Sequence, residues 1–263
     1  MSLQASGLGR DIDDTGIAGL SAYDKIAHRH YSNAAAWSKI GYNPDIGTSE
    51  EDLWAVGGTY LFPTMPQQME VYSANAGDTA AGTGVQQVII YYLDGAGTEK
   101  TEVVTLNGGV VATTATDILR VNGFRAYRVG TGKKAAGNID IRAVADTPIY
   151  SRIPAAYTRA RNSAYRVPAC KTLYVTSITF SSAGTTAGKY ARFSTRATYD
   201  AGQQRPIDFF ALYTEVLVQD GAFNKLLEIP TRLPQGTDIL VSAIAGAAST
   251  LCSCALRGYL VTE

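Results

Sequence analysis

The chain changes character at residues 41–63, which read GYNPDIGTSEEDLWAVGGTYLFP. Thr48 and Glu51 in this stretch have the spacing of a capping box, in which side chains satisfy free N–H groups at the start of a helix. Gly57-Gly58 then indicates the end of that helix, because glycine takes the left-handed conformation without steric cost. We predict a short, tryptophan-bearing capped helix at a hinge or docking point between an N-terminal arm and a sheet.

Residues 21–38, ahead of this stretch, show the periodicity of a helix. The residues of one face recur every three or four positions, as Tyr23, Ile26, Ala27, His30, Ala34 and Trp37. This spacing is typical of an amphipathic helix, whose apolar face must pack against a sheet or another chain. Residues 1–20 are rich in Gly and Asp and show no such pattern. We therefore predict an extended arm followed by a helix.

The composition argues against several classes of function. The chain of 263 residues has a formal net charge of zero, and only 17% of its residues are charged. A neutral chain has no basic footprint for nucleic acid or anionic lipid, so we expect neither nucleic acid nor a membrane among its partners. No apolar run reaches the roughly 18–20 residues that span a bilayer. The first residues do not resemble a signal peptide, so we expect synthesis in the cytoplasm with reduced thiols.

Short strands separated by turn residues fill the chain after residue 63. In the first region we expect strands at residues 69–72, 85–93, 99–106, 118–129 and 138–144. In the second region we expect them at residues 172–181, 190–198, 207–218, 223–229, 239–245 and 254–261. Turns recur at the spacing of antiparallel sandwiches. The predicted fold class is mainly β, with two antiparallel β-sandwich or jelly-roll-like domains, 64–147 and 148–263, preceded by a helical arm, 1–63.

Two expected strands of the first region have clear patterns. Residues 88–92 are all apolar or aromatic, which predicts burial on both faces at the centre of the strand 85–93. Residues 99–106 alternate, with Val103 facing one way and Val104 and Leu106 the other. Asp94-Gly95 between these strands indicates a hairpin turn.

Metal sites find little support in the sequence. His28 and His30 are the only histidines, and residues two apart on a helix point about 200° apart, so the two cannot share a metal ion. Asp11 and Asp13 imitate the start of a calcium loop, but Ala22 stands where the bidentate Glu is needed. We therefore predict no metal site.

Residues 130–134, GTGKK, superficially resemble a phosphate-binding loop. The Walker pattern needs an earlier glycine, where Tyr127 stands, and a Ser or Thr after the lysine, where Lys134 stands. No helix is expected to follow, so we interpret the segment as a solvent-exposed β turn.

The three cysteines are too few for a disulfide scaffold. Cys252 and Cys254 share one face of an expected strand, and Cys170 precedes another strand. We expect buried free thiols, and a disulfide between Cys170 and one of the other two cysteines stays open as an alternative.

No catalytic set can be assembled from the sequence, and we expect no enzyme, no catalytic residue and no cofactor. The carboxylates that could in principle pair as in a glycosidase are Asp78, Asp94, Asp208 and Glu215. No local pattern selects two of them. The sixteen tyrosines could line a sugar-binding face, although β-sandwich cores and subunit interfaces use tyrosine as freely.

Three segments resemble a family of structural proteins of tailed bacteriophages. The first, residues 41–62, is similar to the family pattern GYNP-(D/N)-(V/I)-GTS-E-D-(V/L)-W…GGTY. The second begins with DTAAGTG at residues 78–84 and continues through residues 85–94, TEVVTLNG at 101–108, and 118–122. The third is VPACKT at residues 167–172, with Ile229-Pro230 and Thr237-Asp238-Ile239 further on. The family has glycine where this chain has Cys170.

The resemblance implies a virion structural protein that acts in particle assembly and carries no catalytic residues. It would be a collar, neck or tail-fibre-base component or a capsid decoration protein, docking through its N-terminal arm. The implied partners are other virion proteins of the portal or neck, the tail or the capsid, together with further copies of the chain in a homo-oligomer. The implied location is the virion, after synthesis in the host cytoplasm. The alternative is a carbohydrate-binding or glycan-cleaving receptor-binding module of a virion.

Overall fold

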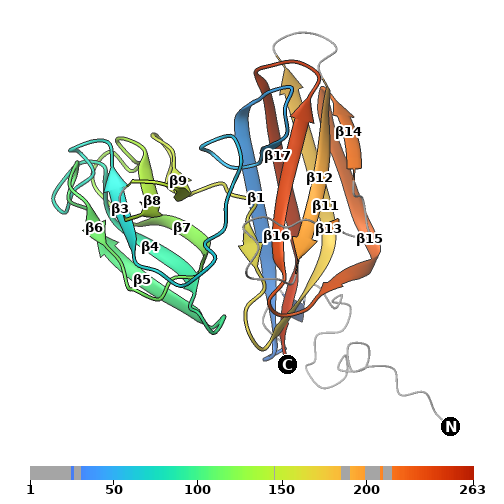
Figure 1. Cartoon of the computed structure of the whole chain (residues 1–263), viewed down its shortest axis with the longest axis horizontal. Helices are drawn as coiled ribbons and strands as arrows, with labels where there is room; N and C mark the ends of the chain where they lie inside the picture. The colour runs from blue at the N-terminus through green and yellow to red at the C-terminus, as the bar shows by residue number, and fades with distance from the viewer. Residues whose placement is uncertain (1–24, 27–30, 145, 185–189, 199–207, 210–214) are drawn as a thin grey trace.

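The computed structural model describes residues 25–26, 31–144, 146–184, 190–198, 208–209 and 215–263. These residues form antiparallel strands that gather into two bodies lying side by side (Figure 1). The larger body contains β1, β2 and β10 to β17, and the smaller body contains β3 to β9. We call them the large body and the small body.

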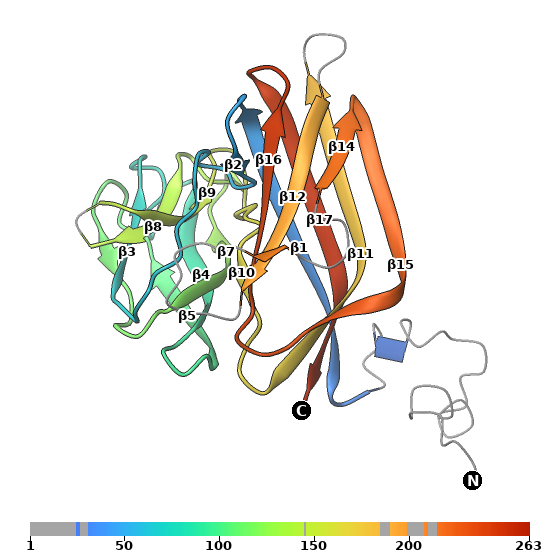
Figure 2. The same ribbon diagram turned by 45° about the vertical axis from the view of Figure 1, so that its right-hand side comes forward.

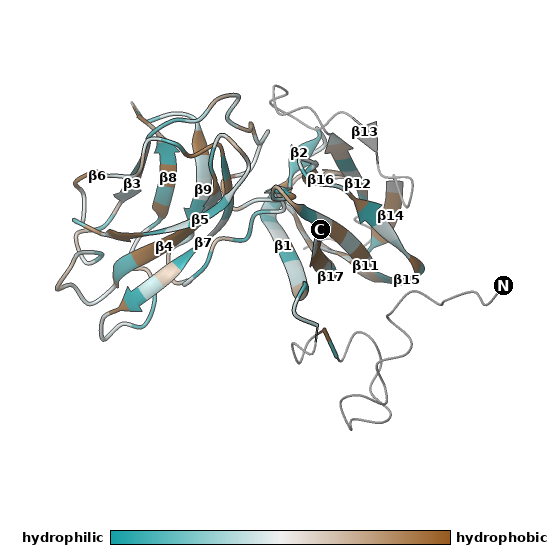
Figure 3. Ribbon diagram, turned by 90° about the horizontal axis from the view of Figure 1, so that it is seen from below, coloured by the Kyte–Doolittle hydropathy of each residue, from teal (hydrophilic) through white to brown (hydrophobic). Residues whose placement is uncertain are grey.

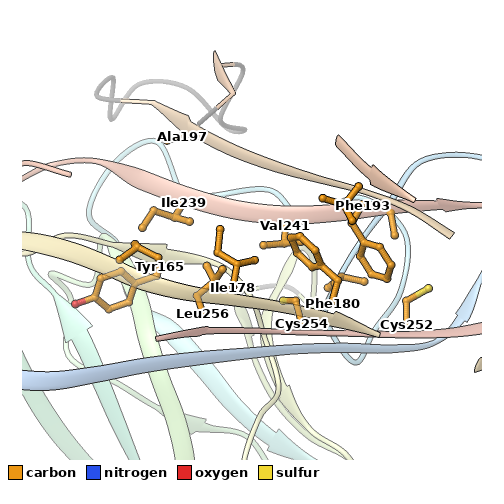
Figure 4. Close-up of a cluster of buried hydrophobic side chains, with 14 of the residues drawn as sticks. Tyr165, Ile178, Phe180, Phe193, Ala197, Ile239, Val241, Cys252, Cys254 and Leu256 are labelled. Carbon is orange, nitrogen blue, oxygen red and sulfur yellow. The ribbon is translucent and has the colours of Figure 1, made fainter. Parts of the chain in front are cut away.

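The large body consists of two facing sheets. The first sheet has the order β1 (Ala34–Ile46), β17 (Thr250–Thr262), β11 (Lys171–Gly184) and β15 (Gly221–Leu233). In the second sheet β16 (Asp238–Ala245) pairs with β2 (Glu51–Asp52), β10 (Tyr165–Arg166) and β12 (Tyr190–Thr198), and β12 also pairs with β13 (Asp208–Phe209) and β14 (Glu215–Gln219). Apolar side chains fill the space between the sheets (Figure 4). Phe180 of β11 stacks on Phe193 of β12 with ring centroids 4.9 Å apart, which joins the two layers.

The sequence of β11 shows how the core face is maintained along a long strand. Leu173 and Val175 are buried, and so are Ile178 and Phe180, so the alternation changes phase between the two pairs. The pairing of β11 with both of its neighbours shifts at the same place, between Val175 and Ser177. A β-bulge adds one residue to a strand and in this way returns the apolar side chains to the same face.

The small body is also built from two sheets. One has the order β6 (Ala112–Thr113), β3 (Met69–Ser73), β8 (Ile139–Ala143) and β9 (Ile149–Ile153). The other has the order β5 (Glu99–Thr105), β4 (Val85–Leu93) and β7 (Arg120–Val129). Alternate residues of these strands, such as Val71, Ile90 and Ile141, are fully buried in a second core.

Most expected strands of this region are confirmed, and the strand 85–93 has the expected bounds. Burial of its centre on both faces is wrong. Val88, Ile90 and Tyr92 are buried, whereas Ile89 and Tyr91 are only half-buried, because the other sheet covers one face of β4. The alternation of residues 99–106 is confirmed, since Val104 and Leu106 are buried.

The expected helix at residues 21–38 is wrong in its final part, because residues 34–38 belong to β1. Ala34 to Asn43 pair with β17, and Trp37 lies in the core of the large body as a strand residue. Long-range pairing has overridden the local helical periodicity. Residues 1–24 and 27–30, which include the arm, His28, His30, Asp11, Asp13 and Ala22, lie outside the described residues.

The expected capped helix after Thr48 is also wrong. Glu51 and Asp52 form the short strand β2, and turns follow. The Glu51 carboxylate accepts hydrogen bonds from the Gly47 and Gly58 amides at 3.0 and 2.8 Å, so it closes a turn and does not cap a helix. Gly57-Gly58 does have positive φ, at 81° and 66°, as glycine at a sharp turn allows.

The division of the chain at residues 63 and 147 stays a prediction, but strand pairing crosses both positions. β1 and β2, from the expected arm, pair with β17 and β16 near the other end of the chain. β9, from the expected second domain, pairs with β8 of the small body. Each body therefore draws strands from more than one of the three expected segments.

Candidate functional site: the junction of the two bodies

The stretch that follows β2 runs between the two bodies and packs against both. Trp54, Tyr60 and Phe62 are buried together with Leu240 of the large body, and Ile149 of the small body packs against them. Trp54 and Phe62 both meet the ring of Tyr60 edge-on, with centroids 5.1 and 4.9 Å away. Trp54 is thus a buried packing residue where the two bodies meet, and its expected role at a hinge or docking point stays a prediction.

A buried ionic cluster joins the bodies beside these rings. The Arg120 guanidinium, from β7 of the small body, donates to both carboxylate oxygens of Asp238 in β16 at 3.0 and 2.8 Å. Arg166 of β10 donates to the same carboxylate at 2.7 Å. Arg120 also donates to the Pro63 carbonyl and lies over the Phe62 ring. Because removal of one partner would leave a buried charge uncompensated, the cluster strongly favours one relative placement of the two bodies.

A cleft of about 280 Å³ lies between β1 and the outer face of the sheet formed by β5, β4 and β7. Figure 3 shows β1 on the side of the large body that faces β4 and β7. The polar residues that line the cleft include Lys39, Tyr91, Asn122, Arg125 and Arg159. Sequence reasoning missed this cleft, because its two walls come from strands that are far apart along the chain.

Lys39 joins the two walls of the cleft. Its ammonium group donates to the Asn122 carbonyl at 2.6 Å and lies 5.8 Å from the centroid of the Tyr165 ring. Burial lowers the pKa of Lys39 from 10.5 to about 7, and the neighbouring Cys254 offsets part of this effect. The protein therefore holds a poorly hydrated amine at the junction.

The buried Asp78 carboxylate holds the surrounding loops in place. Its two carboxylate oxygens accept hydrogen bonds from the Ser73 hydroxyl and from the amides of Val85, Ala136 and Gly137, at 2.7 to 2.9 Å. The DTAAGTG segment is thus held by its own aspartate. Asp94 lies at the other end of β4, where it accepts from the Thr98 amide in the hairpin turn. These two carboxylates form no pair, and the side chains of Asp208 and Glu215 lie outside the described residues.

The interpretation of residues 130–134 as a turn is confirmed. The Gly130 and Gly132 amides donate to the carbonyls of Gly84 and Thr83, both at 2.7 Å. Backbone amides that would cradle a phosphate are therefore already occupied by the loop 82–84.

The three cysteines are free, as expected. Cys252 and Cys254 are buried on the core face of β17, and burial raises the pKa of each thiol to about 12. Cys170 is also free but exposed, so the expectation of a buried thiol is wrong for this cysteine. In the described part of the chain, no group of three metal-ligating side chains and no helix long and apolar enough to cross a membrane is found.

β15 presents a second surface of interest, which sequence reasoning did not single out. It forms an edge of the first sheet on the side of the large body away from the small body (Figure 2). Leu226 and Ile229 of this strand are 69% and 82% exposed, and Leu217 of the neighbouring edge strand β14 is 64% exposed. A long edge strand with exposed apolar side chains is suited to contact with another chain.

No protein-family model and no curated protein matches the chain. Among solved structures, a structure of infectious bursal disease virus, Gx strain, matches with a TM-score of 0.25 and 9% identity, over 88% of this chain and 73% of that one. The crystal structure of the VP2 subviral particle of infectious bursal disease virus matches with a TM-score of 0.21 and 8% identity, over 88% and 72% of the two chains. TM-scores this low do not establish a shared fold.

Proposed function

We propose that the large body is a jelly roll and that the chain is a structural protein of a tailed-bacteriophage virion. The observation that carries this proposal is the nested pairing of its strands. In chain order the principal strands are β1, β2, β11, β12, β14, β15, β16 and β17. The first pairs with the last (β1 with β17), the second with the seventh (β2 with β16), the third with the sixth (β11 with β15) and the fourth with the fifth (β12 with β14).

One long antiparallel hairpin whose two arms together contain eight strands produces nested pairs of this kind. When the hairpin wraps on itself, the eighth strand comes to lie beside the third, and the seventh beside the fourth. β17 pairs with β11, and β16 pairs with β12, in agreement with this wrapping. The result is the double-sheet arrangement of jelly rolls, which occur in viral capsid proteins, lectins and cupins. The small body is then an insertion between the second and third strands of the roll.

The virion role is favoured over the other jelly-roll functions by two further features. The segments at residues 41–62, 78–94 and 101–108 resemble structural proteins of tailed bacteriophages. The exposed apolar edge at β15 offers a contact surface for a second copy or for another virion protein. A collar, neck, tail-fibre-base or capsid decoration protein would use such contacts repeatedly, through its symmetry.

The direct test is mass spectrometry of purified particles of the virus that carries this sequence. We expect the chain in stoichiometric amounts with the other structural proteins. Its absence from particles, when the intact protein is present in infected cells, would overturn the proposal.

Docking through the N-terminal arm needs a separate test. Residues 34–40 belong to β1, so a truncation must leave them in place. We expect deletion of residues 1–24 to lower incorporation into particles while the thermal unfolding of the isolated protein stays unchanged. Full incorporation of the truncated chain would reject the arm as the docking element and leave the virion proposal standing.

A further inference from the structure

The cleft at the junction has an unusual charge balance. Lys39, Arg125 and Arg159 line it, and its lining contains no carboxylate. No ion pair joins any of the three to a carboxylate within the described residues. Positive groups at the walls of a cleft focus a positive potential inside it, because the protein around them has a low dielectric constant. The cleft is therefore suited to an anionic group.

Arg125 is held in place by Tyr91. The Tyr91 hydroxyl accepts from Nε and Nη2 of Arg125 at 3.1 and 2.6 Å, and the guanidinium carbon lies 5.5 Å from the centroid of the Tyr91 ring. A guanidinium has five N–H donors, so donors remain for a ligand carboxylate, which arginine binds in a planar, often bidentate geometry. Holding the guanidinium before binding lowers the entropic cost of capturing such a ligand.

Lys39 supplies the second basic group, from the opposite wall. Within the described residues, its ammonium donates to one acceptor, the Asn122 carbonyl, although an ammonium has three donors. Burial disfavours the charged form of this amine, and an anion placed beside it would favour protonation and pair with the resulting ammonium.

Size and shape suggest what carries the anion. A volume of about 280 Å³ lies just below the range of pockets for drug-sized ligands, so it suits one sugar ring better than a larger ligand. Tyr91 and Ile40 provide apolar surface in the same cleft. Tyr91 is half-buried and Ile40 is 45% exposed, so both can contact the face of a sugar ring.

We propose that this cleft binds a uronic-acid residue of an acidic polysaccharide, with the sugar carboxylate between Arg125 and Lys39 and the ring against Tyr91. Arg159 adds positive charge at the rim. This inference goes beyond assembly, because it assigns the junction a ligand outside the virion. It does not depend on where the protein sits in a particle.

The test is calorimetric titration of the full chain with tetragalacturonate. We expect binding of the oligosaccharide, binding of its methyl ester at least tenfold weaker, and no comparable binding of inorganic sulfate. Arg125→Ala should weaken tetragalacturonate binding at least tenfold, and Lys39→Met should weaken it as well. Arg128→Ala is the matched control, because Arg128 is an exposed arginine of the same strand that does not line the cleft. It should stay within twofold of wild type.

Four outcomes would overturn the proposal. The first two are no binding of tetragalacturonate, and binding of its methyl ester with the same affinity. The third is an equal loss of affinity in Arg125→Ala and Arg128→Ala, when the thermal unfolding of both variants is unchanged. The fourth is binding of sulfate as tight as that of the oligosaccharide. All four are measured on the isolated chain. A failure here is therefore distinguishable from a failure of the virion proposal, which is measured on particles.

Discussion

Gly84 shows how closely single residues are packed in the small body. A Cβ atom at this position would lie 2.2 Å from an Asp78 carboxylate oxygen and 3.0 Å from the Ala136 side chain. That carboxylate holds the surrounding loops through four hydrogen bonds. The DTAAGTG segment thus needs glycine at its end for a steric reason, and it has a structural role.

We expect Gly84→Ala to lower the free energy of unfolding by about 1–3 kcal/mol, because the added methyl group displaces the Asp78 carboxylate or the backbone beside it. Gly109→Ala is the matched control, since a Cβ atom there meets nothing within 4 Å. It should change stability by less than about 0.5 kcal/mol. Urea denaturation measures the change in the free energy of unfolding of each variant. Equal changes in the two variants would show that glycine is not sterically required at position 84.

Lys39 predicts a pH dependence of stability. Its pKa is about 7 in the folded protein and near 10.5 when the chain is unfolded. Between these values the unfolded chain binds more protons than the folded one, so this residue makes stability rise as the pH rises from about 7 to 10.5. The slope is at most about 1.4 kcal/mol per pH unit, and it approaches this value only between the two pKa values.

Lys39→Met should abolish this contribution. Urea denaturation at pH 7.0 and 8.5 should show that wild type gains stability relative to the variant as the pH rises. Lys134→Met, which removes the charge of an exposed lysine in the turn 130–134, is the control. A constant difference between wild type and Lys39→Met across this range would contradict the pKa of Lys39 in the folded state.

At the scale of elements, β15 exposes more of its apolar side chains than an edge strand usually does. It is an edge strand of 13 residues, and a bulge between Thr231 and Leu226 interrupts its pairing with β11. Pro230 lies in this interruption, where its missing N–H group breaks no ladder hydrogen bond. Leu226 and Ile229 remain on the surface, so the strand keeps apolar area available for another chain.

We expect a Leu226→Lys, Ile229→Lys double variant to weaken self-association of the protein, because two charges would have to be desolvated in the contact. Sedimentation velocity over a concentration series measures this. Val110→Lys is the control, since Val110 is 59% exposed but lies in the small body. Unchanged self-association of the double variant, with unchanged thermal unfolding, would exclude the β15 edge as a contact between copies.

At the scale of the whole molecule, the large body closes only when distant parts of the chain meet. β1 covers one edge of β17 over most of its length, and it contributes Trp37 and Ile46 to the core. β2 pairs with β16 in the other sheet. The small body and the junction lie between β2 and β11 in the chain, and the Arg120–Asp238 pair joins them to the large body.

We therefore expect residues 148–263, expressed alone, to lack a cooperative unfolding transition. That fragment omits β1 and β2 and leaves the apolar edge of β17 open, although sequence patterns alone suggest a complete domain. Residues 31–263 are the control and should unfold cooperatively. Calorimetry and near-ultraviolet circular dichroism distinguish the two outcomes, and a cooperatively folding fragment would show that β1 is dispensable.

The sequence by itself determined the strand class of the chain, the bounds of β4, the turns after β4 and β7, and the burial of the cysteines of β17. These features depend on the alternation of apolar and polar residues and on turn residues, which act over a few positions. Tertiary structure alone decided that residues 34–46 form a strand, that β1 and β17 share one body, and that Lys39 and Arg125 line one cleft. Those features depend on pairing and packing between residues far apart in the chain, and no local pattern encodes such contacts.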